Sequence, residues 1–265
     1  MNLSKRILSA IAFCGIAAVT GCVYDDIDGC PTRRYVQIRY DKNLKSADAA
    51  SSEVKSVKIY AADENGTVVY AKKSSAAELS ECGYQVDVSD MPSGNYTLFA
   101  WAEGEQRNSD SYMQVSVTPG KTDVDELKRM IQRNSSCEVD KDLTPLFHGM
   151  AENVDFTDFR TGGTHRAALS LTKNTNNVKI ILQHLSGEPV DVKNFKFFIS
   201  DDNGTVDWNN ELSVSDSVWY KAWSVSSGSA SEEKTSSSRA GQTEIGVAMA
   251  ELTVGRLVKG HRPIL

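Results

Sequence analysis

The sequence of 265 residues lacks the signatures of several common functional classes. It contains no G-x-S-x-G nucleophile motif, no H-E-x-x-H zinc motif and no G-x-x-x-x-G-K-[ST] phosphate-binding loop. It also has no run of lysine or arginine that could bind the phosphates of a nucleic acid, and its formal net charge is −6. These absences argue against an enzyme and against a nucleic-acid partner. An extracellular hydrolase stays open only because two catalytic carboxylates can be far apart in sequence.

Histidine is scarce, and no metal-binding pattern is present. Residues 63–66 and 201–204 resemble the start of a calcium loop, but Ser74 and Leu212 occupy the twelfth position, where such a loop needs a glutamate. We therefore expect turns there, with no metal, no cofactor and no catalytic residue. The histidines are isolated from one another, as surface or hydrogen-bonded histidines usually are: His148, His165, His184 and His261.

An apolar run near the start, residues 7–19, is too short to span a bilayer as a stable helix. It follows Lys5 and Arg6, and small residues lead from it to Cys22, which is the pattern of a bacterial lipoprotein signal. We expect residues 1–21 to be a signal peptide that is removed, and Cys22 to carry the acyl chains, palmitate among them, that tether the protein to a membrane. A plain secretory signal cut elsewhere is the alternative.

Residues 22–34 form a predicted lipidated acidic tether. Asp25, Asp26 and Asp28 follow the cysteine closely, and this segment resembles the tether that sends lipoproteins of the Bacteroides group to the outer face of the outer membrane. An acidic linker without a sorting role is the alternative. Removal of the signal changes the formal charge from −6 to −8, because Lys5 and Arg6 leave with it.

The five cysteines do not form a disulfide framework. Cys14 lies in the signal and Cys22 is the acylation site, which leaves an odd set of three. At most one intrachain pair can form among Cys30, Cys82 and Cys137, and the sequence does not identify it.

The body of the chain is predicted to be all-β. Apolar and polar residues alternate in several segments, which is typical of strands with one buried and one solvated face: residues 35–40, 54–60 and 84–88. Asn, Gly and Pro between them indicate tight turns. An antiparallel layout with turns at this spacing predicts a β-sandwich.

Two segments depart from the strand pattern. Residues 122–131 are the one convincing helical candidate of the first half, because Thr122 or Asp123 could cap it. Its apolar residues fall at helical spacing: Val124, Leu127, Met130 and Ile131. Residues 224–238 are rich in serine and have little apolar content, so we expect an exposed loop between two strands.

An internal repeat indicates two related domains. Residues 58–68 recur as residues 196–206, a constant offset of 138, and six of the eleven positions are identical. Each copy predicts a strand, an Asp-x-Asn-Gly turn and a returning strand, which together form a hairpin. We therefore expect a first sandwich over residues 35–150, a linker over 151–164 and a second sandwich over 165–265.

Several short motifs together resemble those of one family. They are Cys-Val-Tyr-Asp-Asp at residues 22–26 with Cys-Pro at 30–31, Met-Pro-Ser-Gly-Asn-Tyr at 91–96, Leu-Phe-His-Gly at 146–149, Leu-Thr-Lys-Asn-Thr-Asn-Asn at 171–177, Leu-Ser-Gly-Glu at 185–188, Asp-Asp-Asn-Gly at 201–204 with Trp208, and Leu-Thr-Val-Gly-Arg-Leu at 252–257. In combination they resemble the FimB/Mfa-type minor fimbrillin anchor family of Bacteroides and Porphyromonas relatives.

This resemblance implies two tandem transthyretin-like β-sandwich domains and an acyl anchor on Cys22 in the outer membrane, facing the cell surface. It further implies a minor fimbrial subunit that anchors or nucleates a fimbria, binds major and accessory fimbrillins by strand exchange and supports cell adhesion. Members usually continue for some tens of residues past the strand at 252–257, whereas this chain stops at Leu265. The second domain is therefore expected to lack closing strands, either as a fragment or as a gap that accepts a donated strand.

The tryptophans support one alternative function. They could form a platform for sugar rings, which would make the protein a surface glycan-binding lipoprotein beside a nutrient transporter, although aromatic residues in strands more often pack in the core. The residues concerned are Trp101, Trp208, Trp219 and Trp223, with Tyr220.

Overall fold

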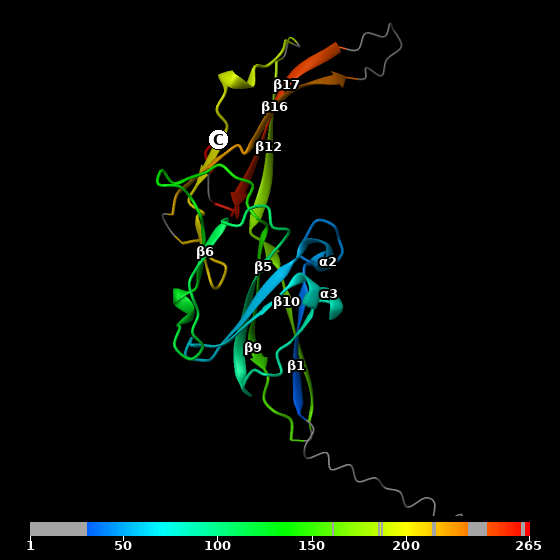
Figure 1. Cartoon of the computed structure of the whole chain (residues 1–265), viewed down its shortest axis with the longest axis vertical. Coiled ribbons are helices and arrows are strands. Elements are labelled where there is room, and N and C mark those ends of the chain that lie inside the picture. Colours follow the sequence, from blue (N-terminus) through cyan, green and yellow to red (C-terminus); the bar gives the residue numbers. More distant parts are fainter. Residues whose placement is uncertain are drawn as a thin grey trace, which may run out of the picture.

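The computed structural model describes residues 31–160, 162–184, 186, 188–213, 216–232, 243–260 and 263–265, and strands dominate it (Figure 1). Cys22, Cys30 and His261 lie outside these residues. The elements are, in chain order, β1 Thr32–Arg39, α2 Ala50–Glu53, β2 Ser56–Ala62, β3 Val68–Ser74, α3 Ala76–Glu81, β4 Gln85–Asp87, β5 Asn95–Glu103, β6 Tyr112–Gln114, η1 Val124–Glu126, β7 Lys128–Ile131, β8 Glu138–Val139, β9 Leu146–Asp155, β10 Gly163–Ser170, β11 Thr172–Lys173, β12 Thr175–Gln183, η2 Val192–Asn194, β13 Phe198–Asp201, β14 Thr205–Asp207, β15 Val218–Lys221, β16 Ser224–Glu232 and β17 Thr243–Gly255.

The first sandwich packs a sheet of order β10-β1-β4 against a sheet of order β11-β9-β5-β2-β3. Alternate residues of β1 face inward, and Val36 and Ile38 are fully buried. They join Ile59 of β2 and Leu98 of β5 in one core. The alternation seen in the sequence thus places one face of each strand inside, as expected for a sandwich.

Two short helices, neither of them predicted from the sequence, cover part of this sandwich. Helix α3 begins with a capping box, in which Ser75 and Glu78 each accept a hydrogen bond from the other's backbone N–H. Its Leu79 is buried in the core of the first sandwich. A serine followed three residues later by a glutamate is a readable signal, so this helix could have been found from the sequence.

The larger sheet of the first sandwich is buried on both faces. Tyr60 of β2 stacks on Phe99 of β5 at 5.0 Å between ring centroids, and Trp101 contacts both rings edge-on. This aromatic cluster faces away from the first core and packs against Leu127 and Trp208. The second face of the sheet is therefore the surface on which the rest of the molecule is built.

The prediction of a helix over residues 122–131 is wrong. Residues 124–126 form a single 3-10 turn, capped by Asp123, and the chain is extended from Leu127 onward. Strand β7 then pairs with both β6 and β14. Val124 and Leu127 have helical spacing, but Arg129 and Ile131 alternate inward as in a strand, and pairing with distant strands decides the outcome.

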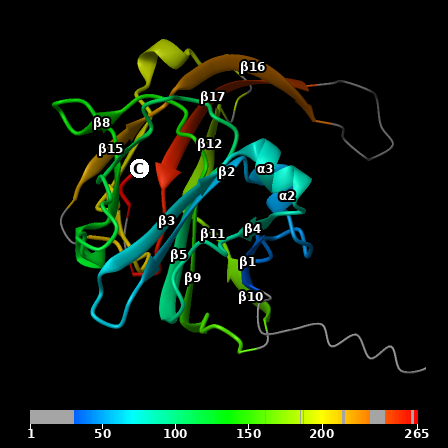
Figure 2. The same cartoon turned by 60° about the horizontal axis from the view of Figure 1, so that its bottom comes forward.

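The second region contains three small sheets of orders β12-β17-β16, β13-β15-β8 and β14-β7-β6. Tyr220 and Leu252 are fully buried in its core. Its β16–β17 hairpin extends beyond the rest of the fold (Figure 2). Residues 224–232, predicted as part of a loop, are strand β16, because they pair along their whole length with β17.

The two copies of the internal repeat fold differently. In the first, β2 and β3 form the predicted hairpin around a turn in which Asp63 Oδ1 accepts hydrogen bonds from the backbone of Asn65 and Thr67. In the second, β13 pairs with β15 while β14 pairs with β7, so the turn connects two sheets and the hairpin prediction is wrong. Asn203 in this turn is fully buried and bonds to Tyr220.

The all-β prediction of two sandwiches is confirmed. The division of the chain into two domains at residues 151–164 stays a prediction. Strands from each side of these residues pair with strands from the other side. Strand β10 pairs in parallel with β1, from Thr32 opposite Gly163 to Arg39 opposite Ser170. Strands β7 and β8 of the first half pair with β14 and β15 of the second.

Candidate functional site

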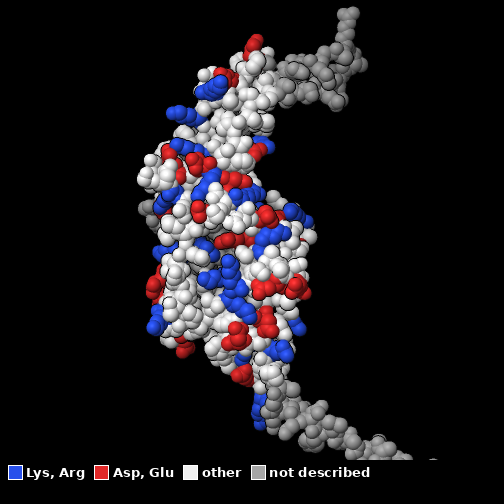
Figure 3. Space-filling view, viewed as in Figure 1, with Lys and Arg blue, Asp and Glu red and all other residues white. Residues whose placement is uncertain are grey.

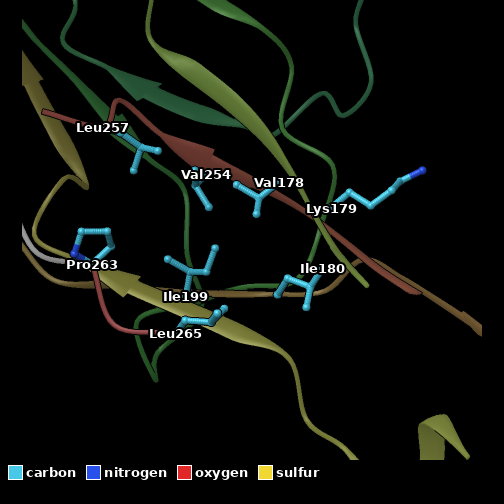
Figure 4. A pocket seen from close by; sticks show the side chains of 8 residues that line it. All are labelled: Val178, Lys179, Ile180, Ile199, Val254, Leu257, Pro263 and Leu265. Atoms are coloured by element: carbon cyan, nitrogen blue, oxygen red, sulfur yellow. The ribbon is translucent and has the colours of Figure 1, made fainter. Parts of the chain in front are cut away.

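An apolar groove opens between the edges of β12 and β13 in the second region (Figure 4). Its volume is about 410 Å³, and the walls are almost entirely aliphatic. The residues that line it are Val178, Lys179 and Ile180 of β12, Ile199 of β13, Val254 of β17, and Leu257, Pro263 and Leu265 of the C-terminal segment.

The groove continues along β12. A second hollow of about 270 Å³ shares Ile180 and Leu265 with the first and adds Leu182 and Phe197. Val178, Ile180 and Leu182 alternate along one face of β12 and are each half-buried. A row of apolar side chains that should face a core is thus covered only in part.

The backbone edges of β12 and β13 beside the groove are also incompletely paired. Within the described residues, β12 pairs along one edge only, with β17. Strand β13 pairs with β15, and its other edge has a single bridge, in which Ser200 and Ile264 exchange two hydrogen bonds of 2.9 Å. A strand edge with free N–H and C=O groups next to an apolar row is the arrangement that accepts an added strand.

Polar contacts at one end of the groove strands brace the segment around Asn210 and join the second region to the first. Asn174 Nδ2 donates to Asn210 Oδ1 at 2.6 Å, and the Arg256 guanidinium donates to the Asn210 carbonyl oxygen. His148 Nε2 donates to the Trp208 carbonyl oxygen at 2.7 Å. Burial lowers the pKa of His148 to about 4, so this histidine is neutral near pH 7.

The other two histidines of the described residues, His165 and His184, make local contacts. His165 stacks on Phe159 at 4.2 Å and donates to the Thr157 carbonyl oxygen, while His184 bonds to Ser186. Among the residues that the structure describes, no three His, Cys, Asp or Glu side chains are grouped to hold a metal ion.

The predicted lipidation site, Cys22, lies outside the described residues, so its role stays a prediction. Cys82 and Cys137 are both exposed free thiols and are not bonded to each other. Cys30 lies outside the described residues, so the structure does not test a disulfide between Cys30 and either of these thiols. In the part of the chain with described structure, no helix is long and apolar enough to cross a membrane.

The tryptophans do not form one platform. Trp101 is buried, and Trp208 packs against the same aromatic cluster while its Nε1 donates to Asp125. Trp219 and Trp223 are exposed by 43% and 36%. Trp219 contacts Phe198, whereas Trp223 donates to Thr253 of β17.

On the face seen in Figure 3, acidic and basic side chains are interspersed.

Fold and groove together define a class: an all-β protein of two sandwiches whose second sandwich presents an open strand edge beside an apolar groove. The sequence matches the profile of the fimbrillin-A associated anchor proteins Mfa1 and Mfa2 over residues 27–264. The chain belongs to this family, and the predicted resemblance is confirmed.

One curated relative is the minor fimbrium anchoring subunit Mfa2 of Porphyromonas gingivalis. It is 21% identical over 226 residues, which cover 83% of this chain and 67% of that protein. The solved structure of the P. gingivalis fimbrial anchor protein Mfa2 superposes with a TM-score of 0.63 at 19% identity, over 88% of this chain and 76% of that one, and so shows the shared fold.

Two solved structures from Bacteroides thetaiotaomicron are also similar. One, described as a candidate adhesin, has 29% identity and a TM-score of 0.69. The other, described as a candidate polysaccharide-binding protein, has 25% identity and a TM-score of 0.70. Each alignment covers 88% of this chain and 75% of the other.

Proposed function

We propose that this protein is a structural, non-enzymatic lipoprotein of the outer membrane that anchors or nucleates a fimbria at the cell surface. The observation that carries the proposal is the apolar groove beside the open edge of β12, in a chain of the fimbrial anchor family. The partners are fimbrial subunits, major and accessory fimbrillins, and their assembly supports cell adhesion.

Binding occurs by strand addition. A strand donated by a fimbrillin forms backbone hydrogen bonds with β12, and its alternate apolar side chains enter the groove between Ile180 and Ile199. Each large apolar side chain that becomes fully buried contributes about 1.5–3 kcal/mol. The backbone pairing gives affinity, and the alternation of side chains fixes the register.

The shape of the molecule suits an anchor. Strand β1 begins at the lower end in Figure 1, whereas β12 and the C-terminal segment at the groove lie in the upper part. Acyl chains on Cys22 would therefore hold the end that precedes β1 at the membrane, with the groove directed away from it. This polarity supports a role at the base of a fimbria.

The groove is tested by two matched substitutions in β12 of the full-length protein. Ile180→Asp places a charge inside the groove, whereas Ile181→Asp places the same charge on the opposite face, where Ile181 is already 57% exposed. Capture of fimbrillins by the tagged protein, after crosslinking on intact cells and mass spectrometry, should fall at least about tenfold for the first and little for the second.

Leu182→Ser provides a milder change farther along the same groove, and the Tm of each variant shows that it has folded. Equal fimbrillin capture by Ile180→Asp, Leu182→Ser and Ile181→Asp would rule out the groove as the binding site. Crosslinking to an outer-membrane transporter without any fimbrillin would favour the glycan-binding alternative instead.

A further inference from the structure

A polar pocket lies on the face of β12 and β17 opposite the groove. Asn177 pairs with Thr253 and Lys179 with Glu251 across the two strands, so these four side chains share one face of the sheet. The pocket has a volume of about 390 Å³, within the usual range for small-ligand sites. Trp223, which precedes β16, forms one wall, and Arg107 and Asp142 from loops of the first half form another.

The wall residues are held in place by a continuous network. The Thr253 hydroxyl is buried and contacts three of them: it accepts from Trp223 Nε1 at 3.2 Å and lies within hydrogen-bond distance of Asp142 and Asn177. Arg107 donates to both carboxylate oxygens of Asp142, at 2.9 and 3.1 Å. The indole is therefore held by its N–H, while Trp223 as a whole remains 36% exposed and lines the pocket.

The charges of the pocket balance one another. Arg107 pairs with Asp142, and Lys179 pairs with Glu251 at 2.7 Å. A charged ligand would have to compete with one of these pairs for its partner, whereas a neutral ligand would not. Hydroxyl groups donate and accept at once, so they can bond to the remaining N–H groups and carboxylate lone pairs without breaking either pair.

We propose that this pocket binds a neutral saccharide, with a sugar ring against the face of Trp223 and its hydroxyl groups bonded to Asn177 and to the two ion pairs. An aromatic face beside planar polar groups suits a ring that has an apolar face and a polar rim. The site lies on the sheet face opposite the apolar side chains of the groove, and both are bordered by Val178 and Lys179 of β12.

The test uses the full-length acylated protein in detergent and three neutral probes: maltohexaose, laminarihexaose and mannohexaose. At least one should bind in isothermal titration calorimetry. Trp223→Ala should weaken binding about tenfold by removal of the stacking surface, and Trp219→Ala should change it less than about twofold. Trp219 is the matched control, since it is an exposed tryptophan on β15 outside the pocket.

Thr253→Val removes the hydroxyl that orients Trp223 and should also weaken binding, with the fold checked by its Tm. Binding of none of the three hexasaccharides would overturn the proposal, as would equal weakening by Trp219→Ala. Polygalacturonate bound more tightly than the neutral probes would contradict the charge argument. Fimbrillin capture by Trp223→Ala should stay at the wild-type level, and its loss would assign the pocket to the assembly interface instead.

Discussion

The two sandwiches differ in how completely they cover their apolar side chains. In the first, Ile38 and Leu98 are fully buried, and the larger sheet is covered on both of its faces. In the second, Ile180 is half-buried, and Phe195 beside it is exposed by 47%. The same kind of strand, with the same alternation, is closed in one region and open in the other.

Because of this difference, apolar side chains in the first sandwich stabilise the folded protein, whereas those at the groove can also contribute to the binding of a partner. A side chain that is already buried in the free protein contributes its transfer free energy to folding. A half-covered side chain at an open edge contributes the remainder only when a partner covers it. We infer that the first sandwich supplies a stable base, while the second holds the capacity to bind another strand.

Removal of the proposed lipid anchor should have the largest effect. Cys22→Ser eliminates the thiol that we propose to be acylated, so the protein should leave the outer membrane almost completely and fimbriae should appear in the culture medium. Immunoblots of membrane and medium fractions measure this release. Cys82→Ser, which changes an exposed thiol in the first sandwich, should leave the protein in the membrane. Fimbriae that remain on Cys22→Ser cells would contradict the anchor.

Because burial differs between the two sandwiches, truncation of a large aliphatic side chain to alanine should lower the free energy of unfolding by different amounts in each. Leu98→Ala in the closed core should lower the free energy of unfolding by about 2–5 kcal/mol, because it removes a fully buried side chain and leaves a cavity. Ile180→Ala at the groove should cost less, roughly 1 kcal/mol, since part of that side chain is already solvated. Urea unfolding of both variants measures the difference. Equal losses would mean that the groove is part of the closed core.

The sequence predicted β1, β4 and the first part of β2, because polar and apolar residues alternate there as in a strand with one solvated face. It failed where distant pairing overrides local pattern. Residues 122–131 have helical spacing, but residues 124–126 form a 3-10 turn and residues 128–131 form β7 between β6 and β14. The second Asp-x-Asn-Gly turn has the same sequence pattern as the first. Its Asn203 is nevertheless buried and hydrogen-bonded to Tyr220, and the strands on either side of it belong to different sheets.

The candidate groove was only partly predictable. The apolar positions 178, 180 and 182 can be read as one face of a strand. Whether that face is covered depends on which strands lie beside it, and this is a property of the whole topology. The pocket at Trp223 was less predictable still, because Arg107, Asp142 and Thr253 come together only in the fold.

The contact between the two regions should respond to pH through His148. Burial, together with the nearby positive charges of Arg256 and Lys42, lowers its pKa from 6.5 to about 4 in the folded protein, while the unfolded chain keeps the ordinary value. The unfolded state therefore binds a proton first as the pH falls. The stability conferred by neutral His148 is complete above about pH 6.5 and is lost progressively toward pH 4, by up to roughly 3 kcal/mol.

Urea unfolding at several pH values between 7 and 4 measures this effect against a His148→Gln variant. Glutamine retains an N–H donor for the Trp208 carbonyl oxygen but does not titrate in this range, so the difference between the two proteins isolates the histidine from the carboxylates that also titrate. The wild type should lose more stability than the variant as the pH falls. Parallel curves would show that His148 is solvated in solution and that the two regions separate there more readily than its burial implies.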